Sequence, residues 1–288
     1  MKTGKFLLLS AVVTIALTAC NNEEIFNELT REIQLDMIYP GQESRATDTQ
    51  FEANDQIGVY ITTADASLQL GGNYVNNTMF EYKSSKWEPN KPCYWVEGTY
   101  DIYAYYPYSP TINDVENYNF QVQEDQTSSL NYTKSDFMWA CTSNYTPNFT
   151  NNPSVSMQFA HKMSNVMVEL VRGENFEGTI PENTKVYLYS IVTSAVIDLS
   201  SGDVAKDSYA GESTVQCFKV DNDTFKAIVV PQSITSKRPL VEVVIDNVSY
   251  LMEGKISYRQ GYRHTITVTL DTDPENIKIN IGGQLGNW

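Results

Sequence analysis

The sequence has 288 residues, and its 41% of hydrophobic residues is enough to build one large domain or two of common size. Its formal net charge of −15 argues against binding nucleic acid through a general positive field. The 19 tyrosines, together with recurrent Thr, Ser and Val, favour strands over helices.

The N-terminus has the pattern of a lipoprotein signal. Lys2 and Lys5 precede an apolar run, Phe6 to Leu17, that is too short to span a bilayer. The run is followed by Thr18-Ala19-Cys20, and Leu17 to Cys20 resembles the lipobox of bacterial lipoproteins. We therefore expect residues 1–19 to be a signal peptide and Cys20 to be the lipidated first residue of the exported chain. The alternatives are an ordinary secretory signal or an N-terminal membrane anchor.

The segment that follows, residues 20–45, contains one predicted strand and a cleavable arginine. Glu32 to Met37 alternates polar with apolar residues, as a half-buried strand does. Pro40-Gly41 breaks the pattern, and Gln42 to Asp48 is polar and accessible to a protease. Cleavage between Arg45 and Ala46 would remove one strand from a finished sheet and open a groove for a strand of another chain. The alternative is a surface arginine in a tolerant loop.

Short strand patterns with turns between them continue from residue 56 to the end. The predicted strands are Gln56–Ile61, Tyr100–Tyr106, Ser154–Phe159, Asn165–Leu170, Lys185–Ile191, Ala195–Leu199, Phe225–Val230, Leu240–Ile245, Ser249–Met252 and His264–Leu270. Asp246-Asn247 is a plausible hairpin turn between two of them. This arrangement predicts an all-β protein made of β-sandwiches.

Chain length favours two such sandwiches in tandem. The polar stretch 142–153 predicts a boundary that separates an N-terminal domain, residues 46–150, from a C-terminal domain, residues 151–288. A last apolar stripe near the end consists of Ile277, Ile279 and Ile281, with polar residues between them. This stripe is a candidate donor strand for the groove of another subunit. The alternative is that it is the last strand of its own sandwich.

No catalytic, cofactor-binding or metal-binding constellation is evident, which points away from an enzyme. His161 and His264 have no neighbouring His or Cys at metal-ligand spacing, so a structural role is expected for both. The cysteines Cys93, Cys141 and Cys217 are widely spaced and odd in number, which favours small buried hydrophobic side chains over a disulfide framework.

Exposed aromatic residues leave open a second function class. Trp87, Trp95 and Trp139, with the many tyrosines, are able to stack on sugars if they are exposed, although core positions are more common for them. A monomeric surface lipoprotein that binds glycan is therefore the rival hypothesis. An extracellular hydrolase is a third class, supported by no marked pair of carboxylates.

Several segments, in order, resemble the fimbrillin family of type V pilus subunits. They are Ser44–Thr47 with Phe51–Tyr60, Tyr103–Tyr108, Asp136–Ala140, Phe159–Val166, Gly261–Val268 and the final Trp288. The resemblance implies two transthyretin-like β-sandwich domains, export as an outer-membrane lipoprotein, cleavage by an arginine-specific protease at Arg45, and polymerisation by strand exchange. It implies a place on the cell surface in a fimbrium, with other fimbrial subunits as partners. The receptor, and a stalk, tip or anchor role, stay open.

Overall fold

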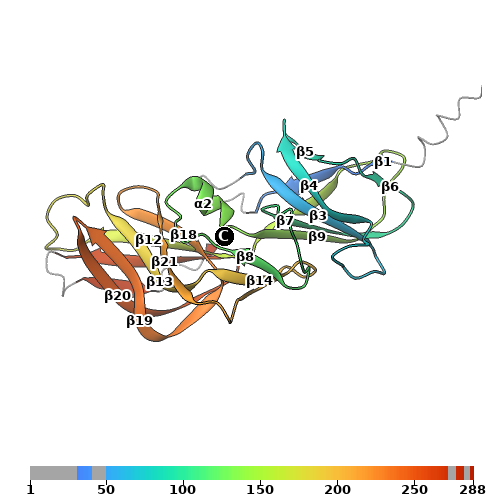
Figure 1. Ribbon diagram of the computed structural model, residues 1–288. Helices are drawn as coiled ribbons and strands as arrows, with labels where there is room; N and C mark the ends of the chain where they lie inside the picture. Colours follow the sequence, from blue (N-terminus) through green and yellow to red (C-terminus); the bar gives the residue numbers. More distant parts are fainter. Residues whose placement is uncertain (1–30, 41–49, 272–276, 282–285) are drawn as a thin grey trace, which may run out of the picture.

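The computed structural model describes residues 31–40, 50–271, 277–281 and 286–288. This part of the chain is built almost entirely from β-strands, with one short helix, α2 (Ser129–Lys134). The strands form two lobes placed end to end, and the C-terminus lies near the junction between them (Figure 1). The predicted all-β class is confirmed.

The first lobe centres on an antiparallel six-stranded sheet with the order β11-β9-β7-β3-β4-β5. Two short ladders complete it: β1 pairs with β6, and β2 pairs in parallel with β10. The bounds are β1 (Arg31–Glu32), β2 (Leu35–Ile38), β3 (Gln56–Thr63), β4 (Val75–Lys83), β5 (Lys86–Pro89), β6 (Tyr94–Trp95), β7 (Tyr100–Tyr106), β9 (Met138–Tyr145), β10 (Val155–Gln158) and β11 (Ala160–His161).

The second lobe consists of two sheets that pack on each other. One has the order β17-β18-β12-β21-β22, with β23 also paired to β21, and the other has the order β16-β13-β19-β20. Buried residues such as Val168 from the first sheet and Leu188 from the second share one core. The bounds are β12 (Ser164–Arg172), β13 (Lys185–Val192), β16 (Glu212–Gln216), β17 (Phe218–Lys219), β18 (Thr224–Val229), β19 (Gln232–Ile245), β20 (Val248–Tyr258), β21 (Tyr262–Leu270), β22 (Lys278–Ile281) and β23 (Gly286–Asn287).

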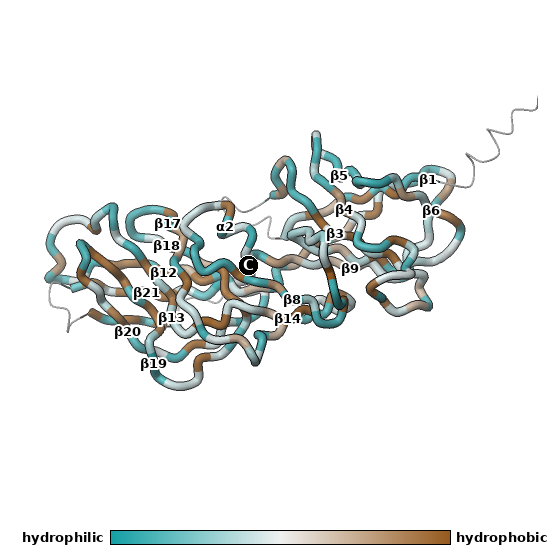
Figure 2. The backbone as a smooth tube through the Cα atoms, in the orientation of Figure 1, coloured by the Kyte–Doolittle hydropathy of each residue, from teal (hydrophilic) through white to brown (hydrophobic). Residues whose placement is uncertain are grey.

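The junction between the lobes has a core of its own. A three-stranded sheet crosses it, in which β14 (Ser194–Asp198) lies between β15 (Asp203–Lys206) and β8 (Tyr118–Gln121). Tyr105 and Phe137 from the first half of the chain are buried there with Ile228 from the second. Hydrophobic residues line the strands of both lobes and of the junction (Figure 2). The lobes are therefore joined by packing as well as by the chain.

Alternating burial explains why the predicted strands form. In β10, Val155 and Met157 are buried while the residues between them are exposed, as predicted. In β3 both faces are buried, because the junction core covers Tyr60 on the face opposite Ile57 and Ile61. The predicted turn at Asp246-Asn247 joins β19 to β20, and both residues have the positive φ, 48° and 67°, that a tight hairpin turn requires.

The structure places the end of the first lobe later than the boundary predicted at residue 150. β10 pairs with β2 and β11 pairs with β9, so the first lobe extends to His161. In the opposite direction, β8 lies before that boundary yet pairs with β14 from the second half. The polar stretch 142–153 includes the end of β9 and a loop of the first lobe, so its polarity reflects solvent exposure and not a linker.

Candidate functional site: an N-terminal strand beside an open groove

The N-terminal segment, residues 31–40, is built into the first lobe. The single strand predicted for residues 32–37 is instead two short strands, because the chain changes partner between them. The N–H of Ile33 donates to the Cys93 carbonyl at 2.8 Å, and the Gln34 carbonyl accepts from the N–H of Val155 at 2.8 Å. The segment thus connects β6 to β10, two strands that are far apart in sequence.

Side chains of the N-terminal segment fill part of the first-lobe core. Ile33, Leu35 and Met37 are 1%, 5% and 6% exposed, whereas Asp36 points to solvent. Burying a side chain of this size stabilises a fold by about 1.5–3 kcal/mol, so the three together contribute roughly 5–9 kcal/mol. Removing the segment would therefore expose a large apolar surface in the rest of the lobe.

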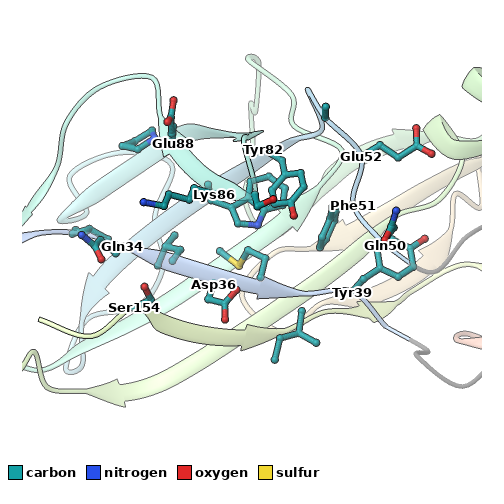
Figure 3. A pocket seen from close by; sticks show the side chains of 18 of the residues that line it. Gln34, Asp36, Tyr39, Gln50, Phe51, Glu52, Tyr82, Lys86, Glu88 and Ser154 are labelled. Atoms are coloured by element: carbon teal, nitrogen blue, oxygen red, sulfur yellow. The ribbon is translucent and has the colours of Figure 1, made fainter.

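Only one edge of β2 is paired within the described part of the chain. Its parallel partner is β10, in the register Leu35 with Val155 and Met37 with Met157. Gln158 extends this ladder, because its Nε2 donates to the Tyr39 carbonyl at 3.2 Å. The opposite edge of β2 faces an open groove of about 1190 Å³ that also borders β5 and the chain at Phe51 (Figure 3).

The groove has an aromatic floor and an acidic rim. The rings of Phe51 and Trp87 meet edge to face at 4.9 Å, and Phe51 meets Phe159 at 5.5 Å. Asp36, Glu52 and Glu88 lie around the groove with Lys86 (Figure 3). The floor suits apolar side chains of an extended strand. The edge of β2 that has no strand partner among the described residues offers backbone hydrogen bonds.

The predicted lipidation and processing residues, Cys20, Arg45 and Ala46, lie outside the described residues. The chain on each side of residues 41–49 is described. Pro40 is buried at the end of the N-terminal segment, and Phe51 returns to the groove floor. The chain that includes Arg45 therefore runs between β2, which borders the groove, and Phe51, which lies on the groove floor.

The candidate donor stripe lies in its own lobe. β22 pairs antiparallel with β21, which brings Ile281 opposite Ile266 and Ile279 opposite Val268. Ile277, Ile279 and Ile281 pack on the second-lobe core but are only partly buried. A donor role for this strand stays a prediction, since here it is an edge strand of its own sheet.

The two histidines have the structural surroundings that the sequence led us to expect. Nδ1 of His161 lies 2.9 Å from the Asp136 carboxylate, and both side chains are buried. Nε2 of His264 accepts the N–H of Arg259 at 2.8 Å, and burial lowers the pKa of this imidazole. Sequence reasoning missed the partner Asp136, because nothing local links it to a histidine 25 residues away.

The cysteines and tryptophans are also placed by packing. Cys93, Cys141 and Cys217 are free thiols, and burial raises the pKa of Cys93 to about 11. Trp87 and Trp95 are buried in the first-lobe core. The indole N–H of Trp139 donates to the Leu199 carbonyl at 2.8 Å. These three tryptophans are therefore not displayed as a sugar-stacking platform.

Two features are absent from the described ranges. No helix there has the length and apolar character needed to cross a membrane. Nor does that part of the chain gather three His, Cys, Asp or Glu side chains in a way that would hold a metal ion.

Solved structures with a similar fold include candidate cell adhesion proteins and a fimbrial protein of bacteria. A candidate cell adhesion protein of Bacteroides ovatus is 18% identical, with a TM-score of 0.70 over 89% of this chain and 96% of that one. A candidate cell adhesion protein of Bacteroides uniformis is also 18% identical, with a TM-score of 0.68 over 89% and 99%. The tip fimbrial protein Mfa3 of Porphyromonas gingivalis is 10% identical, with a TM-score of 0.54 over 90% and 100%.

Sequence comparison gives the family. No curated protein sequence matches the chain. The profile of the fimbrillin-like family matches residues 44–288, which is most of the chain. The family match supports a fimbrial or adhesive role at the cell surface, with other fimbrial subunits as the partners to expect. The chain belongs to the fimbrillin-like family.

Proposed function

We propose that this chain is a fimbrial subunit that is exported as an outer-membrane lipoprotein and polymerises by donor-strand exchange. Lipidation of Cys20 would deliver it to the cell surface, and an arginine-specific protease would then cut between Arg45 and Ala46. The groove would become wider when the N-terminal segment leaves its place beside β10, and the donor strand of another subunit would enter it. Metabolic labelling with a fatty-acid analogue tests the lipid step, which is wrong if a Cys20→Ala variant labels as strongly as its parent.

The observation that carries the proposal is the arrangement of β2. This strand is covalently continuous with the segment that contains Arg45, buries Leu35 and Met37, and pairs along one edge with β10. A strand attached to its own lobe has an effective concentration on the order of millimolar or higher, so a free strand competes poorly with it. Cutting the chain removes this advantage.

The donor that we favour is the strand around Ile277, Ile279 and Ile281. Its apolar side chains alternate with exposed residues, the pattern that the groove requires. It is held at a sheet edge by partly buried side chains, so its release costs less than the release of a fully buried strand.

The experiment that tests the proposal is Arg45→Ala. We expect the variant to keep its N-terminal segment and to remain monomeric, while the parent polymerises after treatment with an arginine-specific protease. Arg172→Ala, which changes an exposed arginine of the second lobe, is the matched control and should polymerise like the parent. Polymers of normal length from the Arg45→Ala protein would refute the proposal.

A monomeric glycan-binding lipoprotein is the alternative function. The burial of Trp87 and Trp95 counts against it, because a sugar platform needs exposed rings. A monomeric binder also has no use for a removable strand. Glycan-array binding by the uncut monomer, at a level unaffected by Arg45→Ala, would favour this alternative.

A further inference from the structure

One buried side chain touches both the N-terminal segment and the last residue of the chain. The ring of Tyr39 lies edge-on to the imidazole of His161, with 5.7 Å between centroids and 76° between planes. The indole of Trp288 stacks on the same imidazole at 3.9 Å, with 6° between planes. Tyr39, Trp288 and Asp136 also line one small cavity of about 80 Å³.

His161 is held rigidly between these two rings. It belongs to β11, whose partner β9 places Met138 opposite it. Its Nδ1 meets the Asp136 carboxylate at 2.9 Å, and His161 is only 4% exposed. A change at Tyr39 therefore reaches Trp288 through a buried imidazole that both rings contact.

Trp288 anchors the end of the C-terminal strands at the lobe junction. The backbone N–H of Trp288 donates to the Gly261 carbonyl at 3.1 Å. β23, just before it in the chain, pairs with Tyr262 and Arg263 of β21. β22 pairs farther along the same strand. The stacked indole therefore helps to hold β22 and β23 against β21.

We propose that the N-terminal segment and the C-terminal strands are coupled through His161, so that loss of the segment loosens β22, β23 and Trp288. The role of this coupling rests on the proposed processing at Arg45, although the three-ring contact exists in the uncut chain. In that setting one proteolytic event opens the groove and frees the donor of the same subunit. Subunits would then be protected from premature polymerisation at both ends.

The size of the coupling follows from the ring contacts. An aromatic pair adds an interaction equivalent to a factor of about 2 to 10 in an equilibrium constant. We therefore expect loss of the Tyr39 contact to increase the opening of the C-terminal strands by about this factor. Coupling between two sites is reciprocal, so loss of the Trp288 ring should increase release of the N-terminal segment by the same factor.

Hydrogen exchange on the uncut monomer tests the coupling without any polymerisation. Tyr39→Ala should speed amide exchange of Trp288, β23 and β22 by about 2- to 10-fold, and leave β12 and β18 unchanged. Asp36→Ala is the matched control, because Asp36 lies on the exposed face of the same segment. Equal exchange of the C-terminal strands in the Tyr39→Ala variant and its parent would overturn the coupling.

A second arm uses protein cut after Arg45 and measures release of the N-terminal segment by mass spectrometry. Trp288→Ala should accelerate the release by the same factor, and an unchanged release rate would overturn the proposal. C-terminal amides that exchange as slowly in freshly cut, still monomeric protein as before cutting, in a sample that then polymerises, would overturn the coupling and leave the fimbrial function standing. Faster C-terminal exchange without polymers would support the coupling and count against the fimbrial function.

Discussion

At the scale of single residues, the lack of a side chain at Gly254 of β20 leaves room for Ile281, at the end of the candidate donor strand. A Cβ atom at this position would lie 2.2 Å from Cδ1 of Ile281 and 2.8 Å from Cδ2 of Leu240. Leu240 is fully buried, whereas Ile281 is partly exposed at a sheet edge, so Ile281 is the side chain that has to move. A side chain at position 254 would therefore require Ile281, and with it the end of β22, to shift.

We expect Gly254→Ala to displace β22 while the second lobe stays folded, at a cost of about 1–3 kcal/mol in the free energy of unfolding. Urea denaturation measures the cost, and hydrogen exchange locates it in β22. Gly211→Ala is the control, because a Cβ there would meet no atom within 4 Å. Unchanged amide exchange of β22 in the Gly254→Ala protein would show that the position of Ile281 does not depend on the space beside Gly254.

His264 gives a residue-scale prediction about pH. Burial is the main cause of its lowered pKa, and the positive charge of Arg259 adds to the shift. The unfolded chain therefore binds a proton more readily than the folded chain once the pH falls below the ordinary histidine pKa of about 6.5. The stabilisation is present above that pH and is lost as the pH falls toward the lowered pKa.

We expect the urea midpoint of the parent to fall between about pH 7.5 and about pH 5.5, and to fall less in a His264→Gln variant. The glutamine amide oxygen is able to accept the same N–H of Arg259 without titrating. The comparison isolates His264 because the other histidine, His161, is unchanged in the variant. Identical pH dependence in the two proteins would contradict the prediction.

At the scale of elements, β2 and β22 are similar strands held with different strength. Each has four residues. β22 alternates polar with apolar side chains, and β2 does so up to its last residue, Ile38, which is apolar and partly buried. β2 buries Leu35 and Met37 almost completely, whereas the isoleucines of β22 stay partly exposed. A strand with this pattern that is loosely held in its own sheet is suited to exchange into the stronger site.

Deleting residues 277–288 from protein cut after Arg45 should give a folded monomer, because the variant keeps the groove and lacks the donor. Circular dichroism and sedimentation measure folding and assembly. Ile279→Asp, which keeps the chain length, is a second variant and should assemble much more weakly than the parent. Unfolding of the shortened protein would assign the strand to its own core, and continued polymerisation would place the donor elsewhere.

At the scale of the whole molecule, local patterns predicted strands but not their partners. β7, β10, β12 and β21 follow from the alternation of apolar and polar residues or from tyrosine content, because each has a face on a core. The pairing of β2 with β10 joins segments about 120 residues apart, and no local pattern records it. The groove beside β2 and the shared junction core depend on such pairings, so they emerge only from the folded chain.

The predicted domain boundary also shows that local patterns do not reveal which segments pack together. A polar stretch with two prolines indicates exposure, and at residues 142–153 exposure belongs to the end of β9 and a loop of the first lobe. Buried contacts across the junction, such as the Gln126 amide that bonds both the N–H and the carbonyl of Ile228, decide how the halves are divided. The hairpin turn at Asp246-Asn247 was predicted correctly, because a tight hairpin depends only on neighbouring residues.

The last prediction uses two variants, one that has only a donor strand to offer and one that has only an acceptor groove. A donor-only chain carries Arg45→Ala and therefore keeps its own groove filled. An acceptor-only chain is cut after Arg45 and lacks residues 277–288. Neither is expected to polymerise alone, whereas an equimolar mixture should form a dimer and stop, because the dimer has no further free groove and no further free donor.

Analytical ultracentrifugation of the mixture measures this outcome, and a mixture of two donor-only samples is the control. Tyr39 still contacts His161 in the donor-only chain, so its C-terminal strands should leave slowly and the dimer should form over a long time. Adding Tyr39→Ala to the donor-only chain should speed dimer formation by about 2- to 10-fold. Long polymers in the mixture would mean that assembly does not run through one groove and one strand per subunit, and a mixture that stays monomeric would exclude the C-terminal strand as the donor.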